Sequence, residues 1–155
     1  MMLLRKRNDM TIDNEKIAYV EGILNNLRYY RRQRDYADRQ IRKYQAQLEQ
    51  EKITGGVHSP PIMSSDEAKY QKGTKIYKNK VEYLLGEIAV NEAQRDYFQK
   101  TLDRYDAFMN RLDPAEKDLI FSKYERQMSY EEIATELFRA RESIRREIRN
   151  ILMKW

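Results

Sequence analysis

The residues with the clearest chemical potential are arginines close to the C-terminus. Residues 139–155 contain six basic and two acidic side chains. Ile144, Ile148 and Ile151 recur at helical spacing, which predicts a helix from about Arg141 that buries one side and exposes the other. An arginine fork can bond a guanine edge or a phosphate through two hydrogen bonds. The pattern therefore favours a polyanionic partner, most often nucleic acid.

We expect this helix to enter the major groove of double-stranded DNA. The candidates for contacts with base edges lie near its start and are Arg141, Glu142, Ser143, Arg145 and Arg146. The candidates for phosphate contacts, which would position the domain on DNA, are Arg139, Arg149 and Lys154. The alternative is a three-helix bundle in which the same arginines only form a solvated face.

Two short capped helices are expected ahead of this one. Residues 113–116 read Asp-Pro-Ala-Glu, which is an acidic N-cap, a proline at the first helical position and a glutamate to complete a capping box. Residues 129–132 repeat the capping arrangement with serine and glutamate. The side chains expected to point inward are Leu119, Ile120, Tyr124, Ile133, Ala134 and Leu137. With a turn at residues 138–140, the order is that of a helix-turn-helix.

Four stretches of this segment match the pattern of a known domain. They are the tyrosine-ended stretch 119–124, Ser-Tyr-Glu-Glu-Ile-Ala at 129–134, Leu137, and Arg-Glu-Ser-Ile-Arg-Arg at 141–146. In these residues the segment resembles the −35-reading C-terminal domain of bacterial sigma factors. Phe138 stands where that family usually has glycine in the turn, and Ala140 stands where it usually has a capping serine. The resemblance implies a sigma-like DNA-binding domain over residues 113–155.

Two long helical patterns precede this domain, each with apolar residues at alternating steps of three and four. The first runs from about residue 13 to 52 through Val20, Ile23, Leu27, Tyr30, Arg34, Ala37, Ile41, Tyr44 and Leu48. The second contains Tyr77, Val81, Leu84, Ile88, Asn91, Arg95, Phe98, Leu102, Tyr105, Met109 and Leu112. A Gly/Pro/Ser loop at 53–65 separates them. The simplest arrangement is an antiparallel hairpin, with polar interruptions facing each other; the alternative is pairing of each helix across a dimer.

The fold class predicted from these patterns is all-α. Residues 1–11 show no period and are expected to be a flexible tail, and residues 12–112 form a long-helix region for oligomerisation or partner binding. The whole layout resembles the RinA/ArpU family of phage transcription regulators, because it joins a helical region, a Gly-Gly/Pro/Ser loop, a second helix and a sigma-like domain. That resemblance implies a sequence-specific regulator, an activator of phage or prophage late genes, with host RNA polymerase as a further partner.

The net charge of +5 is confined to the N-terminal part of the chain. The first 43 residues contain 11 basic and 6 acidic side chains, whereas residues 44–112 and residues 113–155 are each neutral in sum. The basic side chains expected to form a secondary patch are Arg28, Arg31, Arg32, Arg39, Arg42 and Lys43. This patch could extend phosphate contacts along DNA or bind an acidic partner.

Composition argues against most other classes of protein. The chain has no cysteine and one histidine, His58, so we expect no thiolate metal site, no other metal site, no cofactor and no catalysis. No apolar run approaches the ~18 residues of a membrane span, so we expect no membrane partner. The resemblance to the RinA/ArpU family implies a cytoplasmic location in a bacterial host cell, and the long heptad-patterned helices favour a homo-oligomer, most simply a dimer. The alternative function is a DNA-packaging component similar to the small terminase subunit, although those proteins usually have their DNA-binding domain at the N-terminus.

Overall fold

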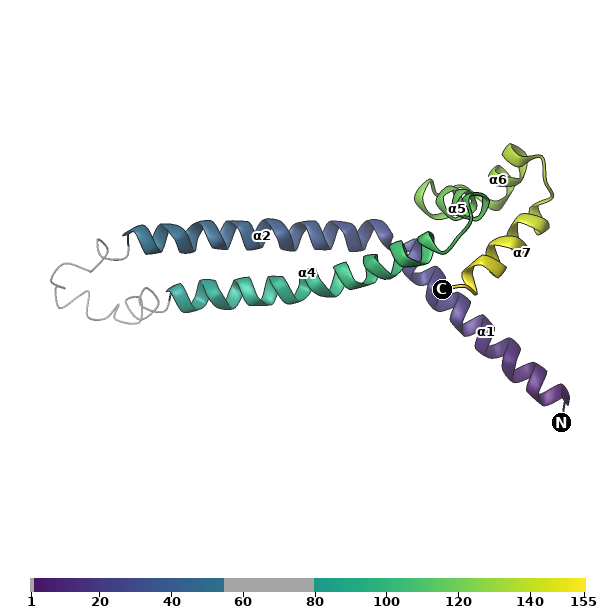
Figure 1. Ribbon diagram of the computed structural model, residues 1–155, viewed down its shortest axis with the longest axis horizontal. Helices are drawn as coiled ribbons and strands as arrows, with labels where there is room; N and C mark the ends of the chain where they lie inside the picture. Colours follow the sequence, from purple (N-terminus) through teal and green to yellow (C-terminus); the bar gives the residue numbers. More distant parts are fainter. Residues whose placement is uncertain (1, 55–79) are drawn as a thin grey trace, which may run out of the picture. The chain divides into compact units, whose positions relative to one another are not determined.

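The computed structural model describes the backbone of residues 2–54 and 80–155 and the side chains of residues 9–53 and 80–155. Most of these residues are helical and none of them is in a strand, which confirms the all-α prediction. The elements are α1 (Met2–Asn25), α2 (Leu27–Thr54), α4 (Lys80–Asn110), α5 (Pro114–Ile120), the π-helical turn η2 (Phe121–Glu125), α6 (Tyr130–Leu137) and α7 (Arg141–Leu152) (Figure 1). Ile53 and Thr54 still belong to α2, whereas the rest of the expected loop, His58 and Tyr77 lie outside the described residues.

The first helical pattern forms two helices, where the sequence predicts one. α1 begins at Met2, within the expected tail, and the first 21 residues include neither glycine nor proline to prevent this. The break comes at Asn26, whose side-chain amide donates to the Gly22 carbonyl at 2.6 Å. Its own N–H donates to the Ile23 carbonyl, three residues back, at 3.0 Å. An asparagine side chain that competes for helix carbonyls weakens the helix at that point.

The chain divides into two compact units, and the boundaries differ from those expected. The first unit consists of residues 1–31 and 100–155, and the second consists of residues 32–99. The sequence analysis places a domain boundary after Leu112, whereas the first unit includes α1 and the last part of α4. The reason is that the short C-terminal helices share their core with both of these segments.

In the second unit, α2 and α4 lie side by side and run antiparallel (Figure 1). The hairpin interior is formed by heptad residues from both helices, and the buried ones are Ala37, Ile41, Leu84, Ile88 and Asn91. Val81, which the pattern assigns to this seam, is instead 40% exposed because it lies in the first turn of α4. Asn91 is buried but satisfied, since its amide donates to the Glu87 carbonyl at 2.8 Å.

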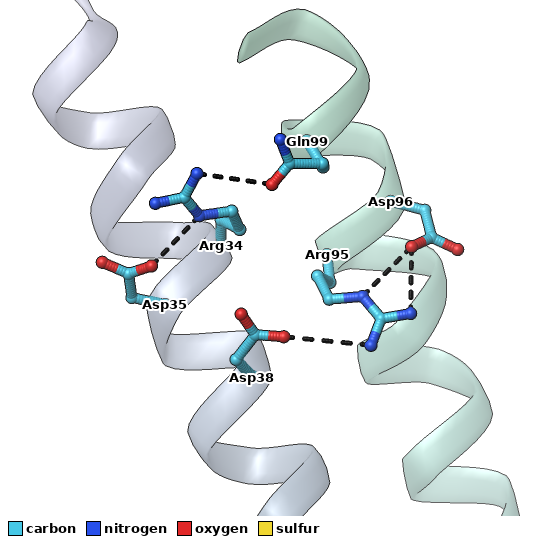
Figure 2. Close-up of polar contacts among 6 residues, drawn as sticks. All are labelled: Arg34, Asp35, Asp38, Arg95, Asp96 and Gln99. Carbon is cyan, nitrogen blue, oxygen red and sulfur yellow. Dashed lines mark hydrogen bonds and ion pairs between the residues drawn. The ribbon is translucent and has the colours of Figure 1, made fainter. Parts of the chain in front are cut away.

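Polar residues from both helices meet midway along the hairpin, as Figure 2 shows. The Arg34 guanidinium donates to Gln99 Oε1 at 3.3 Å, and the Arg95 guanidinium lies 3.8 Å from the Asp38 carboxylate. Each arginine also pairs with the acidic residue that follows it in the chain. The two arginines that interrupt the heptads therefore each have a polar neighbour on the other helix, and this arrangement fixes one register of the hairpin.

The first unit has a continuous apolar core. Its buried members are Ile17, Val20, Leu24, Leu27, Leu102, Tyr105, Phe108, Leu112, Leu119, Ile120, Tyr124, Ile133, Ala134, Ile144, Ile148, Ile151 and Leu152. α1 closes this core against α7, and Lys16 Nζ donates to the Met153 carbonyl at 2.8 Å. The Arg111 guanidinium donates to the Lys154 carbonyl at 3.2 Å. Two cations thus satisfy carbonyls at the C-terminal end of α7, where the helix dipole favours positive charge.

The predicted caps of the short helices are present. Asp113 Oδ1 accepts from the Glu116 N–H at 2.9 Å, and Glu116 Oε1 accepts from the Asp113 N–H at 3.2 Å. Ser129 Oγ accepts from the Glu132 N–H at 3.1 Å. One inward prediction is wrong: Leu137 is 46% exposed, because it is the last residue of α6 and the core beside that helix is already filled by Ile133 and Ala134.

Candidate nucleic-acid interface

α7 has one apolar side and one polar side, as its residue spacing predicts. Its buried residues are Ile144, Ile148, Ile151 and Leu152, and they point into the core of the first unit. At 3.6 residues per turn, the direction opposite to these side chains is occupied by Glu142, Arg146 and Asn150, which follow one another at intervals of four. All three are exposed. We call this line of three residues, together with the flanking Ser143, the outer face of α7.

The arginines of α7 differ in how they are held within the chain. Arg145 lies 3.6 Å from Glu142, and Arg141 lies 3.6 Å from Glu131 of α6. Both pairs are well exposed, so they contribute little to stability and exchange readily for other partners. The side chain of Arg146, at the centre of the outer face, has no hydrogen bond or ion pair within the described part of the chain. Its guanidinium is therefore the one best placed to meet an outside acceptor.

Asn150 is a candidate that the sequence analysis misses. It lies one turn after Arg146 and lines the same surface depression as Arg146, Glu142 and Ser143. Asparagine can bond the N6 and N7 atoms of adenine together, in the way that arginine bonds guanine. Its spacing of four residues from Arg146 is the sequence signal that places it on the same face of the helix. A prediction based on basic side chains alone does not include it.

The turn before α7 has an unusual backbone for its residue type. Phe138 has φ 53° and ψ 43°, which is the left-handed region, and its side chain is 95% exposed. A residue with a Cβ costs about 1 kcal/mol or more there relative to glycine. The conformation ends α6, because it lets the Arg139 N–H donate back to the Ala134 carbonyl at 2.9 Å. At the next helix, Ala140 is the N-cap and supplies no side-chain bond.

The three candidates for phosphate contacts all have partners within the chain. Arg139 donates to Ser143 Oγ at 2.9 Å and pairs with Glu147, which ties the turn to α7. Arg149 donates to the side-chain oxygen of Asn14 in α1. Lys154 pairs with Glu116 at 2.5 Å. All three side chains are exposed. To contact a phosphate, each of them would have to leave its present partner, a requirement that the sequence did not indicate.

The residues of the secondary basic patch divide into two kinds. Arg39, Arg42 and Lys43 are exposed on α2 within the second unit, and Arg32 is exposed at the start of that unit. Arg28 is exposed on the first unit. Arg31 does not belong with them, because its guanidinium is engaged inside the first unit. The six residues stay candidates for the patch, and Arg31 would have to leave its partner Glu125 to take part in it.

Arg31 forms a fork with Glu125 that also involves Tyr105. The two terminal nitrogens of the guanidinium donate to the two carboxylate oxygens at 2.6 and 2.8 Å, and Tyr105 Oη donates to Glu125 Oε1 at 3.1 Å. The guanidinium carbon lies 5.8 Å from the centre of the Tyr105 ring. The hydrogen bond from Arg31 lowers the pKa of Glu125, and the same bond raises the pKa of Arg31. Burial, and then the Glu125 charge, raises the pKa of Tyr105.

Other classes of site have little support among the described residues. Within them, no group of three or more histidine, aspartate or glutamate side chains is arranged to hold a metal ion. None of the helices described is both long and apolar enough to cross a lipid bilayer. Comparison of the chain with protein-family models, with curated proteins and with solved structures finds no match. The resemblances to sigma factors and to RinA/ArpU regulators therefore stay expectations drawn from the sequence.

Proposed function

We propose that this protein is a sequence-specific DNA-binding transcription regulator that reads the major groove with the outer face of α7. The observation that carries the proposal is the arrangement of Glu142, Arg146 and Asn150 in one exposed line. A glutamate can accept from cytosine, an arginine can bond guanine and an asparagine can bond adenine. Residues four apart on a helix are about 6 Å apart along its axis, which is close to twice the ~3.4 Å rise of a base pair, so neighbouring members of the line can reach bases about two base pairs apart.

The surroundings of α7 support the same proposal. α6 and α7 pack on each other and are connected by a three-residue turn. Two packed helices joined by a short turn are the structural unit of a helix-turn-helix. Arg139, Arg149 and Lys154 flank the outer face and can contact phosphates once they leave their present partners. On the resemblance to RinA/ArpU regulators, the proposal extends to activation of phage or prophage genes, with host RNA polymerase as the protein partner.

Capture of genomic fragments by the purified protein tests the proposal and identifies the target together. We expect a small number of strongly enriched fragments. The Arg146→Ala substitution should weaken the free energy of binding to these fragments by ~1–3 kcal/mol. Arg104→Ala is the matched control, because Arg104 is also an exposed arginine, lies on α4 and is not part of the outer face of α7. Enrichment no better than that of random fragments would refute the proposal.

A further inference from the structure

Three arginines on the outer side of α2 have no partner within the part of the chain that the structure describes. Arg32, Arg39 and Arg42 are exposed, and none of their guanidinium groups forms a hydrogen bond or an ion pair there. Their spacing places them on the side of α2 away from the buried Ala37 and Ile41. All three belong to the second unit. We call them the free arginines of α2.

Local spacing along α2 would favour ion pairs for two of these arginines. Asp35 precedes Arg39 by four residues, and Asp38 precedes Arg42 by four. An acid four residues before a base is the order that favours an ion pair along a helix. Asp35 and Asp38 are also the only acidic residues between positions 32 and 48. If both acids paired along the helix, this side of α2 would be close to neutral.

In the structure, both acids pair instead with the arginines that interrupt the apolar heptads (Figure 2). Asp35 Oδ1 accepts from Arg34 Nε at 3.0 Å, and Asp38 Oδ1 lies 3.8 Å from Arg95 Nη1 of α4. The arginines of the hairpin seam thus hold the two acids with which the free arginines would otherwise pair. The positive charge on the outer side of α2 is left without compensation as a result.

The outer side of α2 suits a phosphate backbone better than a protein surface. Tyr36, which is 50% exposed, is the one aromatic or large aliphatic side chain among the exposed residues between positions 32 and 46. Stable protein interfaces have a core of buried apolar side chains, which this side does not offer. Phosphate binding needs closely spaced cations, and an arginine fork bonds phosphate through two hydrogen bonds. Arg32 and Arg42 are about 15 Å apart along the helix axis, a length over which duplex DNA presents several phosphates.

We propose that the free arginines of α2 form a second, sequence-independent contact surface for the phosphates of double-stranded DNA, and that the arginine pairs of the hairpin seam keep this surface basic. The choice of duplex DNA among polyanions rests on the proposed function of α7. The binding of a polyanion by α2 does not, because it depends only on charges within the second unit. The polar residues of the seam then have a role besides setting the register of the hairpin.

Binding of the full chain to random-sequence duplex DNA at several salt concentrations tests the surface. We expect the double variant Arg39→Ala with Arg42→Ala to lower the slope of log K against log salt by up to ~1.8, since each phosphate contact contributes ~0.9. The matched control is Lys100→Ala with Arg104→Ala, which removes two exposed cations from α4 and should leave the slope unchanged. All four altered residues are exposed, so both double variants should keep their helical circular dichroism. No fall in the first double variant, or an equal fall in both, would overturn the surface.

The role of the seam is tested by Arg95→Leu, which releases Asp38 to pair with Arg42. We expect the slope to fall by up to ~0.9, although Arg95 itself lies at the seam. The fall should disappear when Asp38→Asn is added, because no acid then remains to be released. Arg104→Ala removes the same charge as Arg95→Leu and should keep the native slope. A native slope in Arg95→Leu, or no recovery in the double variant, would refute this role.

These measurements separate the α2 surface from base reading by α7. If the proposed function fails, the native chain selects no motif, yet the slope for random duplexes still falls in the Arg39 and Arg42 double variant. If the α2 surface fails, that variant keeps the native slope, whatever motif the native chain selects. Competition with single-stranded RNA tests the choice of polyanion, and we expect the random duplex to compete at least as well. Preferential competition by the RNA would contradict the choice of double-stranded DNA.

Discussion

The fork between Arg31 and Glu125 gives a prediction that the structure quantifies. The two side chains are 37% and 16% exposed, so the pair lies between a surface ion pair, worth at most ~1 kcal/mol, and a buried pair, whose disruption costs ~3–5 kcal/mol. With two charge-assisted bonds, we expect a coupling free energy of about 2 kcal/mol. It is measured by a double-mutant cycle with Arg31→Ala, Glu125→Ala and the double variant.

Urea unfolding followed by Trp155 fluorescence is the suitable assay. Trp155 is the one tryptophan of the chain, and its ring centre lies 5.1 Å from that of the buried Phe108, so it reports on the first unit. Arg104→Ala is the control, since that arginine is exposed on the same unit and should leave the free energy of unfolding within ~0.5 kcal/mol of the native value.

The same coupling must depend on pH in a defined direction. Arg31 lowers the pKa of Glu125 in the folded chain below its ordinary value of 4.5. The stabilisation is therefore complete above about pH 4.5 and is lost as the pH falls through the folded-state pKa. A coupling below ~0.5 kcal/mol at neutral pH, or one that stays constant down to about pH 3, would refute the reasoning.

Three smaller changes test other parts of the account. Phe138→Gly should raise the free energy of unfolding by about 1 kcal/mol because it removes a left-handed residue with a Cβ, whereas Phe138→Ala should give no gain; urea midpoints decide. Ser129→Ala should lower the stability of the first unit by ~1 kcal/mol in the same assay, through loss of the α6 cap. In DNA-binding titrations at several salt concentrations, Arg39→Ala should lower the slope of log K against log salt by up to ~0.9, and Arg31→Ala should leave it unchanged.

Local patterns in the sequence predict much of the fold. Heptad spacing identifies Ala37, Ile41, Leu84 and Ile88 as the hairpin seam, and all four are buried. The caps at residues 113 and 129 and the buried isoleucines of α7 follow from rules that act over a few residues. Each of these features depends on residues within one or two helical turns of each other. The information that determines them is therefore present in a short stretch of the sequence.

What the sequence does not predict depends on contacts between distant residues. Arg31 reads as one more arginine in a basic helix, and only the fold brings it to Glu125, 94 residues away. Phe108 is fully buried although it lies outside the heptad stripe, because the first unit packs around α4 on more than one side. The break at Asn26 likewise has no strong sequence signal, since neither glycine nor proline marks it.

The candidate interface shows the same division. Spacing predicts that Arg141, Arg145 and Arg146 are exposed on α7, and they are. It cannot show that Arg139 and Arg149 are held by Glu147 and Asn14, because those partners depend on how the turn and α1 pack against α7.

The central claim is that α7 reads DNA bases with Arg146, and selection from a pool of randomised duplexes tests it most directly. The native protein is predicted to enrich a defined motif, and Arg146→Ala is predicted to lose the preference at one guanine while keeping the salt dependence of its binding. Arg104→Ala should return the native motif. The same motif with the same affinity from Arg146→Ala, or no motif from the native protein, would contradict the claim.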